Sequence, residues 1–393
     1  SERLVRPPRR SGASPGARWH GALEPGRAGG RRRSGAALRA ADPSAVPDLW
    51  TAGPAEVYSG QAQKALYLLK EENTFLFESA IEESLEALRD EREKDEENRK
   101  AVEAANADAG KDALALRERM EEVRDKERLR VVTELIYLKV CSKFKAMQVP
   151  FIPPMKGGGD VQFGNLDLTG LTTELYSKDA LEMVREHLYG IIGQEAGAQY
   201  MSLRELALFQ GGQIYALSAL FGYYLRRADA RFQLEKMLSG SFDAGGSAFE
   251  PGSQEAQSLK DYISTFGPEE VARMTTITSM EAQMALETQV TALFGDLRVL
   301  RERLVESLGP ISTPQEANER LLKAIQNKEI ESMRIRTTDL RRMVLEAVAY
   351  GSMLNEAEKS VDTIYELTPA ASRPMGSITG DDDEEESGRF LNE

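Results

Sequence analysis

The sequence predicts an all-α protein, a multi-helix bundle built from two diverged helical repeats. Apolar residues recur at three- and four-residue steps along most of the chain, and no stretch shows the sustained alternation that indicates a strand. Serine, threonine or proline stands where several of these segments begin, and glycine where two of them end. The pattern around Gly222 returns in a looser form around Gly351, which indicates a duplication.

Charge is distributed unevenly along the 393 residues, whose formal net charge is −14. Residues 1–41 hold ten arginines against Glu2 and Glu24, which leaves −22 on the remainder. An arginine-rich, acid-poor leader before an acidic body is typical of an organelle transit peptide. The alternative is a basic arm that binds nucleic acid, but so acidic a body would be repelled by a phosphate backbone. We therefore expect no nucleic-acid partner.

The residue types exclude several other classes of protein. No run of 18 apolar residues occurs, so we expect no transmembrane segment. Cys141 is the single cysteine, which excludes an intramolecular disulfide and fits a reducing compartment. One cysteine and two histidines cannot assemble a Cys/His zinc site, and we expect neither a metal nor a cofactor.

Composition divides the chain into four parts. Residues 1–60 are predicted to be the transit peptide and a disordered linker, because they are rich in Pro, Gly and Arg without periodicity. Residues 61–238 form the first helical repeat with a charged helical insertion, and residues 255–367 form the second. Residues 368–393 are predicted to be an acidic disordered tail.

The first repeat opens with a helical pattern from Gln61 that breaks at Ala105–Gly110. A long helix over about Asp112–Met147 follows, and Lys156–Gly170 is predicted to be a flexible glycine-rich loop. That loop lacks the ending of a phosphate-binding loop. The apolar residues of the long helix are expected to form one face: Leu116, Met120, Val123, Val131, Leu135 and Leu138.

Capping residues predict where the later helices begin. Ser177 caps a helix that runs to Ile192, and Ser202 with Glu205 is interpreted as the capping box of the next long helix. In the second repeat, Pro268 precedes two acids and Thr313 precedes a proline, and both patterns mark helix starts. Further helices are expected from about residues 279 and 336. No segment of the chain is predicted to form a sheet.

Several short segments occur in an order that is characteristic of one family. They are Glu134–Tyr137, Val149–Pro153, Ser177–His187, Gln213–Ser218 and Arg231–Lys236. In these segments the chain resembles the plant and algal UV-B-induced chloroplast proteins that contain the domain of unknown function numbered 760. The resemblance covers about residues 115–240 and extends more loosely over Leu259–Glu358. It implies a nuclear-encoded, plastid-targeted soluble protein with no assigned catalytic activity.

Small residues line one side of the predicted helix around Gly222. Glycine inside a helix costs about 1 kcal/mol relative to alanine, so a packing reason is expected. We interpret the strip as the contact for a neighbouring helix, with a flat wall for a ligand ring as the alternative. The predicted helix-packing residues are Gly212, Ala216, Ala219, Gly222 and Gly351.

A polar belt follows this strip and is the candidate partner-binding site. Its residues are Tyr215, Tyr223, Tyr224, Arg226, Arg227, Asp229 and Arg231. Aromatic and arginine side chains are favoured at binding hot spots, which supports contact with a partner or an anion. The spacing also fits intrahelical ion pairs, such as one between Arg226 and Asp229, and this structural interpretation is the favoured one.

His187 carries no recognisable catalytic pattern. A di-iron bundle requires Glu three residues before the histidine, where this chain has Val184. No general-base partner is evident, so we interpret His187 as a structural residue at the edge of the core and assign no catalytic residue.

These observations favour a non-enzymatic helical protein of the chloroplast, in the stroma or at the thylakoid surface. It would bind other plastid proteins as a factor associated with light or UV-B stress, as the family resemblance implies. The rival is an enzyme or small-molecule carrier with a cavity between the two repeats, lined by Tyr215, Tyr223 and His187. Peripheral contact with a membrane surface is a weaker alternative, because the net charge of −22 on residues 42–393 opposes anionic lipid.

Overall fold

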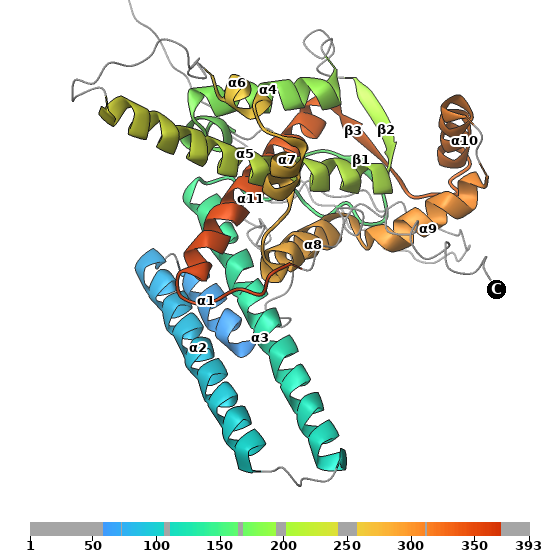
Figure 1. Cartoon of the computed structure of the whole chain (residues 1–393). Helices are drawn as coiled ribbons and strands as arrows, with labels where there is room; N and C mark the ends of the chain where they lie inside the picture. The colour runs from blue at the N-terminus through green and yellow to red at the C-terminus, as the bar shows by residue number, and fades with distance from the viewer. Residues whose placement is uncertain are drawn as a thin grey trace, which may run out of the picture. The chain divides into compact units, whose positions relative to one another are not determined.

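The computed structural model describes residues 58–71, 73–105, 111–163, 168–193, 202–242, 258–310 and 313–370. The predicted transit peptide, nearly all of its linker and the tail beyond residue 370 lie outside these ranges. The described part is mostly helical, as the sequence predicts, and Figure 1 shows its elements.

Three helices open the described chain, namely α1 (Gly60–Lys70), α2 (Thr74–Ala105) and α3 (Lys111–Ala146). Helix α1 runs parallel to the second half of α3, because it is fixed to α3 at both ends. The Ser59 amide donates to Glu134 Oε2 at 2.8 Å, and Lys145 Nζ donates to the Leu69 carbonyl at 2.6 Å. The first half of α3 therefore extends beyond α1, beside α2 (Figure 1).

The middle of the chain holds β1 (Gly159–Val161), the π-helical turn η2 (Gly170–Glu174), α4 (Lys178–Ile192), β2 (Leu203–Ala207) and α5 (Leu208–Phe242). Helix α4 begins where its serine predicts, because Ser177 Oγ accepts from the Ala180 amide at 3.1 Å. It ends at Gly193, whose φ of 90° is a backbone conformation that favours glycine.

The last part holds α6 (Leu259–Ser264), α7 (Pro268–Thr275), α8 (Met280–Phe294), α9 (Leu297–Leu308), α10 (Pro314–Gln326), β3 (Ser332–Arg336) and α11 (Thr337–Asp362). The starts of α7 and α10 agree with the proline and threonine signals in the sequence. Thr313 Oγ1 accepts from the Glu316 amide at 3.2 Å, which satisfies one of the free amides at the start of α10.

The expectation that no sheet forms is wrong. The three strands form one small sheet in the order β1-β3-β2, with β1 parallel and β2 antiparallel to β3. Strands of three to five residues are too short for alternation to be recognised. The interpretation of Ser202 and Glu205 as a capping box also fails, because Glu205 lies in β2 and α5 begins only at Leu208.

The predicted flexible loop at Lys156–Gly170 is also partly ordered. Its residues Gly159–Val161 form β1 and pair with Met333–Ile335 of β3. Asp160 in this segment forms an ion pair with Arg334, whose Nε lies 2.7 Å from Asp160 Oδ1. Buried groups of α11 hold the segment as well, since Arg342 donates to the Pro150 and Phe163 carbonyls.

Helices α5 and α11 cross at the centre of the hydrophobic core. A Cβ atom added at Gly222 would overlap the Val348 carbonyl, and one added at Gly351 would overlap the Ala219 carbonyl. Each of these helices is preceded directly by a strand, and the two strands pair with each other. The duplication itself stays a prediction.

Candidate functional site

The tyrosines of the polar belt lie inside the protein. Tyr215 is 0% and Tyr223 is 1% exposed, so neither can contact a partner at the surface of this structure. The Tyr223 hydroxyl donates to Glu358 Oε2. The other oxygen of this carboxylate, Oε1, accepts from the Thr278 hydroxyl and the Ser279 amide, which directly precede α8. Tyr224 is also buried.

The arginines of the belt fasten neighbouring elements to α5. Arg227 Nη1 donates to three carbonyls at the end of α7, those of Arg273, Met274 and Thr276, at 3.1–3.2 Å. Arg226 pairs with Glu356 of α11, and the same carboxylate pairs with Lys143 of α3. These contacts satisfy carbonyls and carboxylates that would otherwise need water or a ligand.

Arg231 and Asp229 of the belt also contact neighbouring parts of the fold. Arg231 pairs with Glu270 of α7 and, at 3.3 Å, with Glu235 of its own helix. Asp229 accepts from Ser177 Oγ at 2.8 Å and from Gln233 Nε2 at 3.2 Å, where the sequence suggested Arg226 as its partner. The belt therefore connects α5 mainly to other elements of the fold.

The small-residue strip faces other helices along the whole of its length. Gly212 lies against Leu297 and Phe294, and Gly222 lies against the backbone of α11. Ala216 and Ala219 are fully buried between them. Side chains and backbone therefore already occupy the space in which a ligand ring would stack.

His187 is half-buried and stacks on Phe221, with ring centroids 4.2 Å apart and planes 6° apart. Its Nε2 lies 3.1 Å from Ser218 Oγ. Burial lowers the pKa of His187 to about 4, so the ring is neutral at physiological pH. Stacking and a single hydroxyl contact place it at a core edge.

One buried acid was not singled out by sequence reasoning. Glu346 of α11 is 0% exposed, and burial raises the pKa of its carboxyl to about 8. Its Oε2 accepts from the Ile152 amide at 2.8 Å, and Tyr215 donates to its Oε1 at 3.4 Å. The one signal in the sequence was an acid within the apolar run Val344–Val348. Its hydrogen bonds indicate a structural role.

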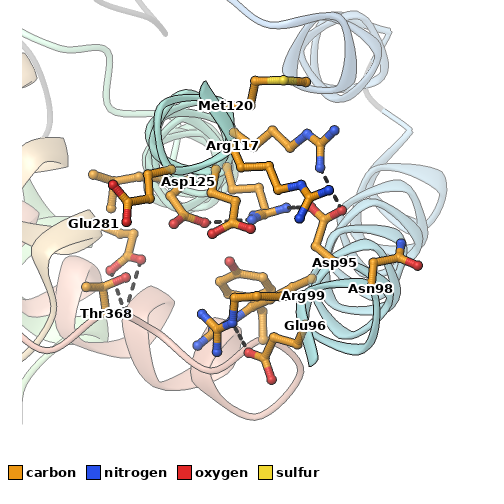
Figure 2. A pocket seen from close by; sticks show the side chains of 16 residues that line it. Asp95, Glu96, Asn98, Arg99, Arg117, Met120, Asp125, Glu281 and Thr368 are labelled. Atoms are coloured by element: carbon orange, nitrogen blue, oxygen red, sulfur yellow. Dashed lines mark hydrogen bonds and ion pairs between the residues drawn. The ribbon is translucent and has the colours of Figure 1, made fainter. Parts of the chain in front are cut away.

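A groove of ≈ 970 Å³ lies between α2 and α3. Charged side chains dominate its walls, and Figure 2 shows them converging from both helices, with Glu281 and Thr368 on a third side. The charged lining residues are Arg92, Asp95, Glu96, Arg99, Arg117, Glu118, Glu121, Arg124, Asp125, Arg128 and Glu281.

Ion pairs cross this groove at its inner end. Asp95 of α2 pairs with both Arg124 and Arg128 of α3, at 3.0 and 2.7 Å. Arg92 donates to the Glu366 carbonyl at 3.0 Å, and its guanidinium lies 5.8 Å from the centre of the Tyr365 ring. Burial raises the pKa of Glu281, which accepts from the Thr368 amide at 3.1 Å. Paired charges of this kind join α2 to α3 along the groove.

An exposed apolar stripe runs along α3 beside the groove. Leu116, Met120 and Val123 are 63%, 50% and 62% exposed, and Met120 extends away from the charged cluster in Figure 2. The sequence predicted a single face that continues to Leu138, but only the later part of it is buried. The reason is that the helices that pack on α3 contact its later part, α1 at Glu134, α8 at Tyr137 and α11 at Lys143.

Two further findings limit the chemistry of the described residues. They contain no cluster of His, Cys, Asp and Glu that could hold a metal ion. Within the same ranges, no helix is long and apolar enough to cross a membrane.

Comparison with known proteins confirms the family resemblance. Residues 95–238 match the family described as a protein of unknown function, DUF760. The chain is also 28% identical over 327 residues to a UV-B-induced, chloroplastic protein of Arabidopsis thaliana, which covers 74% of this chain and 72% of the relative. No solved structure matches the chain. The family match includes the outer part of α2, all of α3 and most of α5, and therefore the belt and most of the residues that line the groove.

Proposed function

We infer that this chain, which carries a DUF760 domain over residues 95–238, is a chloroplast protein that acts by binding another protein rather than by catalysis. Two features support the compartment: its similarity to a chloroplastic relative and the arginine-rich, acid-poor leader. The relative is described as UV-B-induced, which supports a role in light or UV-B stress. We place the protein in the stroma or at the thylakoid surface.

The exposed stripe on α3 is the observation that carries a binding function. We name the outer parts of the two helices, Asp90–Ala105 and Lys111–Arg130, the α2–α3 arm. The arm carries Leu116, Met120 and Val123 in sequence positions that place them on one helix face, each at least half exposed. Apolar side chains gathered on one face cost free energy in water, and such surfaces mark interaction sites.

The polar belt supports this site less well. Its tyrosines are buried, and its arginines bind carbonyls and carboxylates of α7 and α11. A partner at the belt would have to displace these contacts. The arm needs no such rearrangement, because its apolar side chains are already exposed to solvent.

The rival function, an enzyme or carrier with a cavity between the repeats, has less support. Tyr215 and Tyr223 donate hydrogen bonds to buried carboxylates, and His187 is stacked on Phe221. At the crossing of α5 and α11, Gly222 and Gly351 bring the backbones of the two helices into contact. A ligand at that crossing would have to separate them.

Affinity purification after cross-linking in intact chloroplasts tests this proposal. The wild-type chain is compared with a variant in which Leu116, Met120 and Val123 are all changed to Ser. A matched control changes Leu203, Val305 and Leu322 to Ser, since these side chains are 57–59% exposed elsewhere on the protein.

We expect the wild type and the control to retain the same set of proteins and the stripe variant to lose them. Identical sets from all three chains would contradict a binding role of the arm. A small molecule that co-purifies in stoichiometric amount, with no protein, would favour the rival.

A further inference from the structure

We propose that the stripe of Leu116, Met120 and Val123 docks an amphipathic α-helix of a partner protein whose apolar seam is flanked by acidic residues. This rests on the proposed binding function of the arm and specifies the chemistry of the partner.

The spacing of the stripe is that of a coiled-coil seam. Met120 follows Leu116 by four residues and Val123 follows Met120 by three, which is the alternation of d, a and d positions in a heptad. All three side chains lie on a regular part of α3 and are exposed. A second helix laid along this face would bury them in the manner of knobs in holes.

The residues at the e and g positions that flank the stripe are all basic. In the same heptad, the e positions are Arg117 and Arg124 and the g positions are Arg119 and Lys126. Four acids occupy the outer b, c and f positions, namely Glu118, Glu121, Glu122 and Asp125, and Glu127 takes the a position that follows Val123. Charges at e and g select the partner helix and its orientation, so four cations there favour a helix with Glu or Asp at the facing positions.

The existing contacts of these cations leave them able to meet a partner. Lys126 pairs with Glu122 at 2.6 Å along the surface of α3, and its side chain is 71% exposed. Arg124 pairs with Asp95 at 3.0 Å, and its side chain is 47% exposed. The pair of Lys126 with Glu122 is exposed on both sides, and exposed pairs are weak, so an acidic helix can share this cation.

The same charges argue against other occupants. A second copy of this chain would place arginine and lysine opposite arginine and lysine at every e and g position, in either orientation. A basic partner helix would meet the same repulsion. Leu116 to Val123 spans about 10 Å at 1.5 Å per residue, so the contact is short and we expect binding in the micromolar range.

Two synthetic peptides test the proposal directly. Both have four heptads with the same isoleucine and leucine seam, one with Glu and one with Lys at all e and g positions. Each carries a fluorophore, and its binding to the full chain is measured by fluorescence anisotropy at 50 mM salt. We expect the acidic peptide to bind at least tenfold more tightly than the basic one, with a difference that shrinks as salt screens the charges.

A charge-reversal variant distinguishes charge-selected docking from non-specific hydrophobic binding. Arg119→Glu with Lys126→Glu leaves the stripe intact and is expected to abolish the preference for the acidic peptide, because two arginines and two glutamates then flank the stripe. The variant Leu322→Ser, at an exposed apolar residue on α10, is the control and should bind like the wild type. Far-ultraviolet circular dichroism checks that both variants keep their helix content.

Equal binding of the two peptides, a preference for the basic one, or self-association of the chain through the stripe would overturn the proposal. Its failure is distinguishable from failure of the proposed function. If chloroplast partners depend on the stripe while the acidic peptide shows no preference, only the partner chemistry is wrong. If the acidic peptide binds while no chloroplast partner depends on the stripe, the proposed function is wrong.

Discussion

Gly222 of α5 and Gly351 of α11 make reciprocal contacts at one helix crossing. Gly222 lies against the carbonyl of Val348, and Gly351 lies against the carbonyl of Ala219, with no room for a Cβ atom at either position. The sequence alone suggests that Gly222 is the more sensitive position, because it belongs to the fuller strip of small residues. The structure makes the two positions equivalent.

We therefore predict that Gly222→Ala and Gly351→Ala destabilise the protein to a similar extent. Each methyl group must push the two backbones apart, and overpacking of this kind costs about 1–3 kcal/mol or more. Urea unfolding midpoints of the two variants measure the effect. Because both changes force the same separation, the double variant should lose less than the sum of the two. Gly190→Ala is the control, since nothing lies within 4 Å of its added Cβ atom.

A second prediction concerns the belt. Arg227→Gln removes a charged donor from three carbonyls at the end of α7. A hydrogen bond to a charged group contributes about 1.5–3 kcal/mol, so we expect the variant to lose at least this much unfolding free energy. Arg303→Gln removes one exposed ion pair with Glu331 and should cost about 0–1 kcal/mol. Thermal unfolding of both variants tests the difference. Equal melting temperatures would mean that Arg227 does not stabilise α7.

The third prediction is a pH dependence that arises from Glu346. Burial raises the pKa of its carboxyl in the folded protein to about 8, well above the ordinary value of 4.5. Between these two values the folded state retains a proton that the unfolded state has lost. The stability contributed by this group is therefore complete below about pH 4.5 and is lost as the pH rises toward 8, at about 1.4 kcal/mol per pH unit.

Glu346→Gln keeps the shape of the side chain and cannot ionise. The difference in unfolding free energy between wild type and variant should shift against the wild type from pH 5 to pH 8 and then level off. Burial also raises the pKa of Glu281, but this group is common to both chains and its effect cancels in the difference. A difference that stays constant across this range would show that Glu346 is ionised in the folded state.

Local signals in the sequence located many of the helices. Ser177, Pro268 and Thr313 mark true helix starts, because capping depends on side chains close to the amides that they satisfy. Strands β2 and β3 were missed, since each is only five residues long and is stabilised by pairing with a distant segment. Local sequence patterns do not identify the distant segment with which a strand pairs.

The candidate site was harder to predict for the same reason. Periodicity identified the apolar face of α3 but could not show that α1, α8 and α11 cover only its later part, which leaves Leu116 and Val123 exposed. The spacing of the belt arginines suggested intrahelical pairs, while the main partners of Arg227 are carbonyls of α7 that lie more than 40 residues away in the chain. Both outcomes depend on tertiary contacts.

Site-resolved cross-linking in intact chloroplasts tests the binding role of the arm most directly. Lys126 borders the stripe and its side chain is 71% exposed, whereas Lys260, at 64% exposed, lies on α6. With an amine-reactive cross-linker, we predict links from Lys126 to another protein in the wild type. Those links should disappear when Leu116, Met120 and Val123 are changed to Ser, while any links from Lys260 persist. Links to other proteins that arise from Lys260 alone, or that are unaffected by the three serines, would contradict the account.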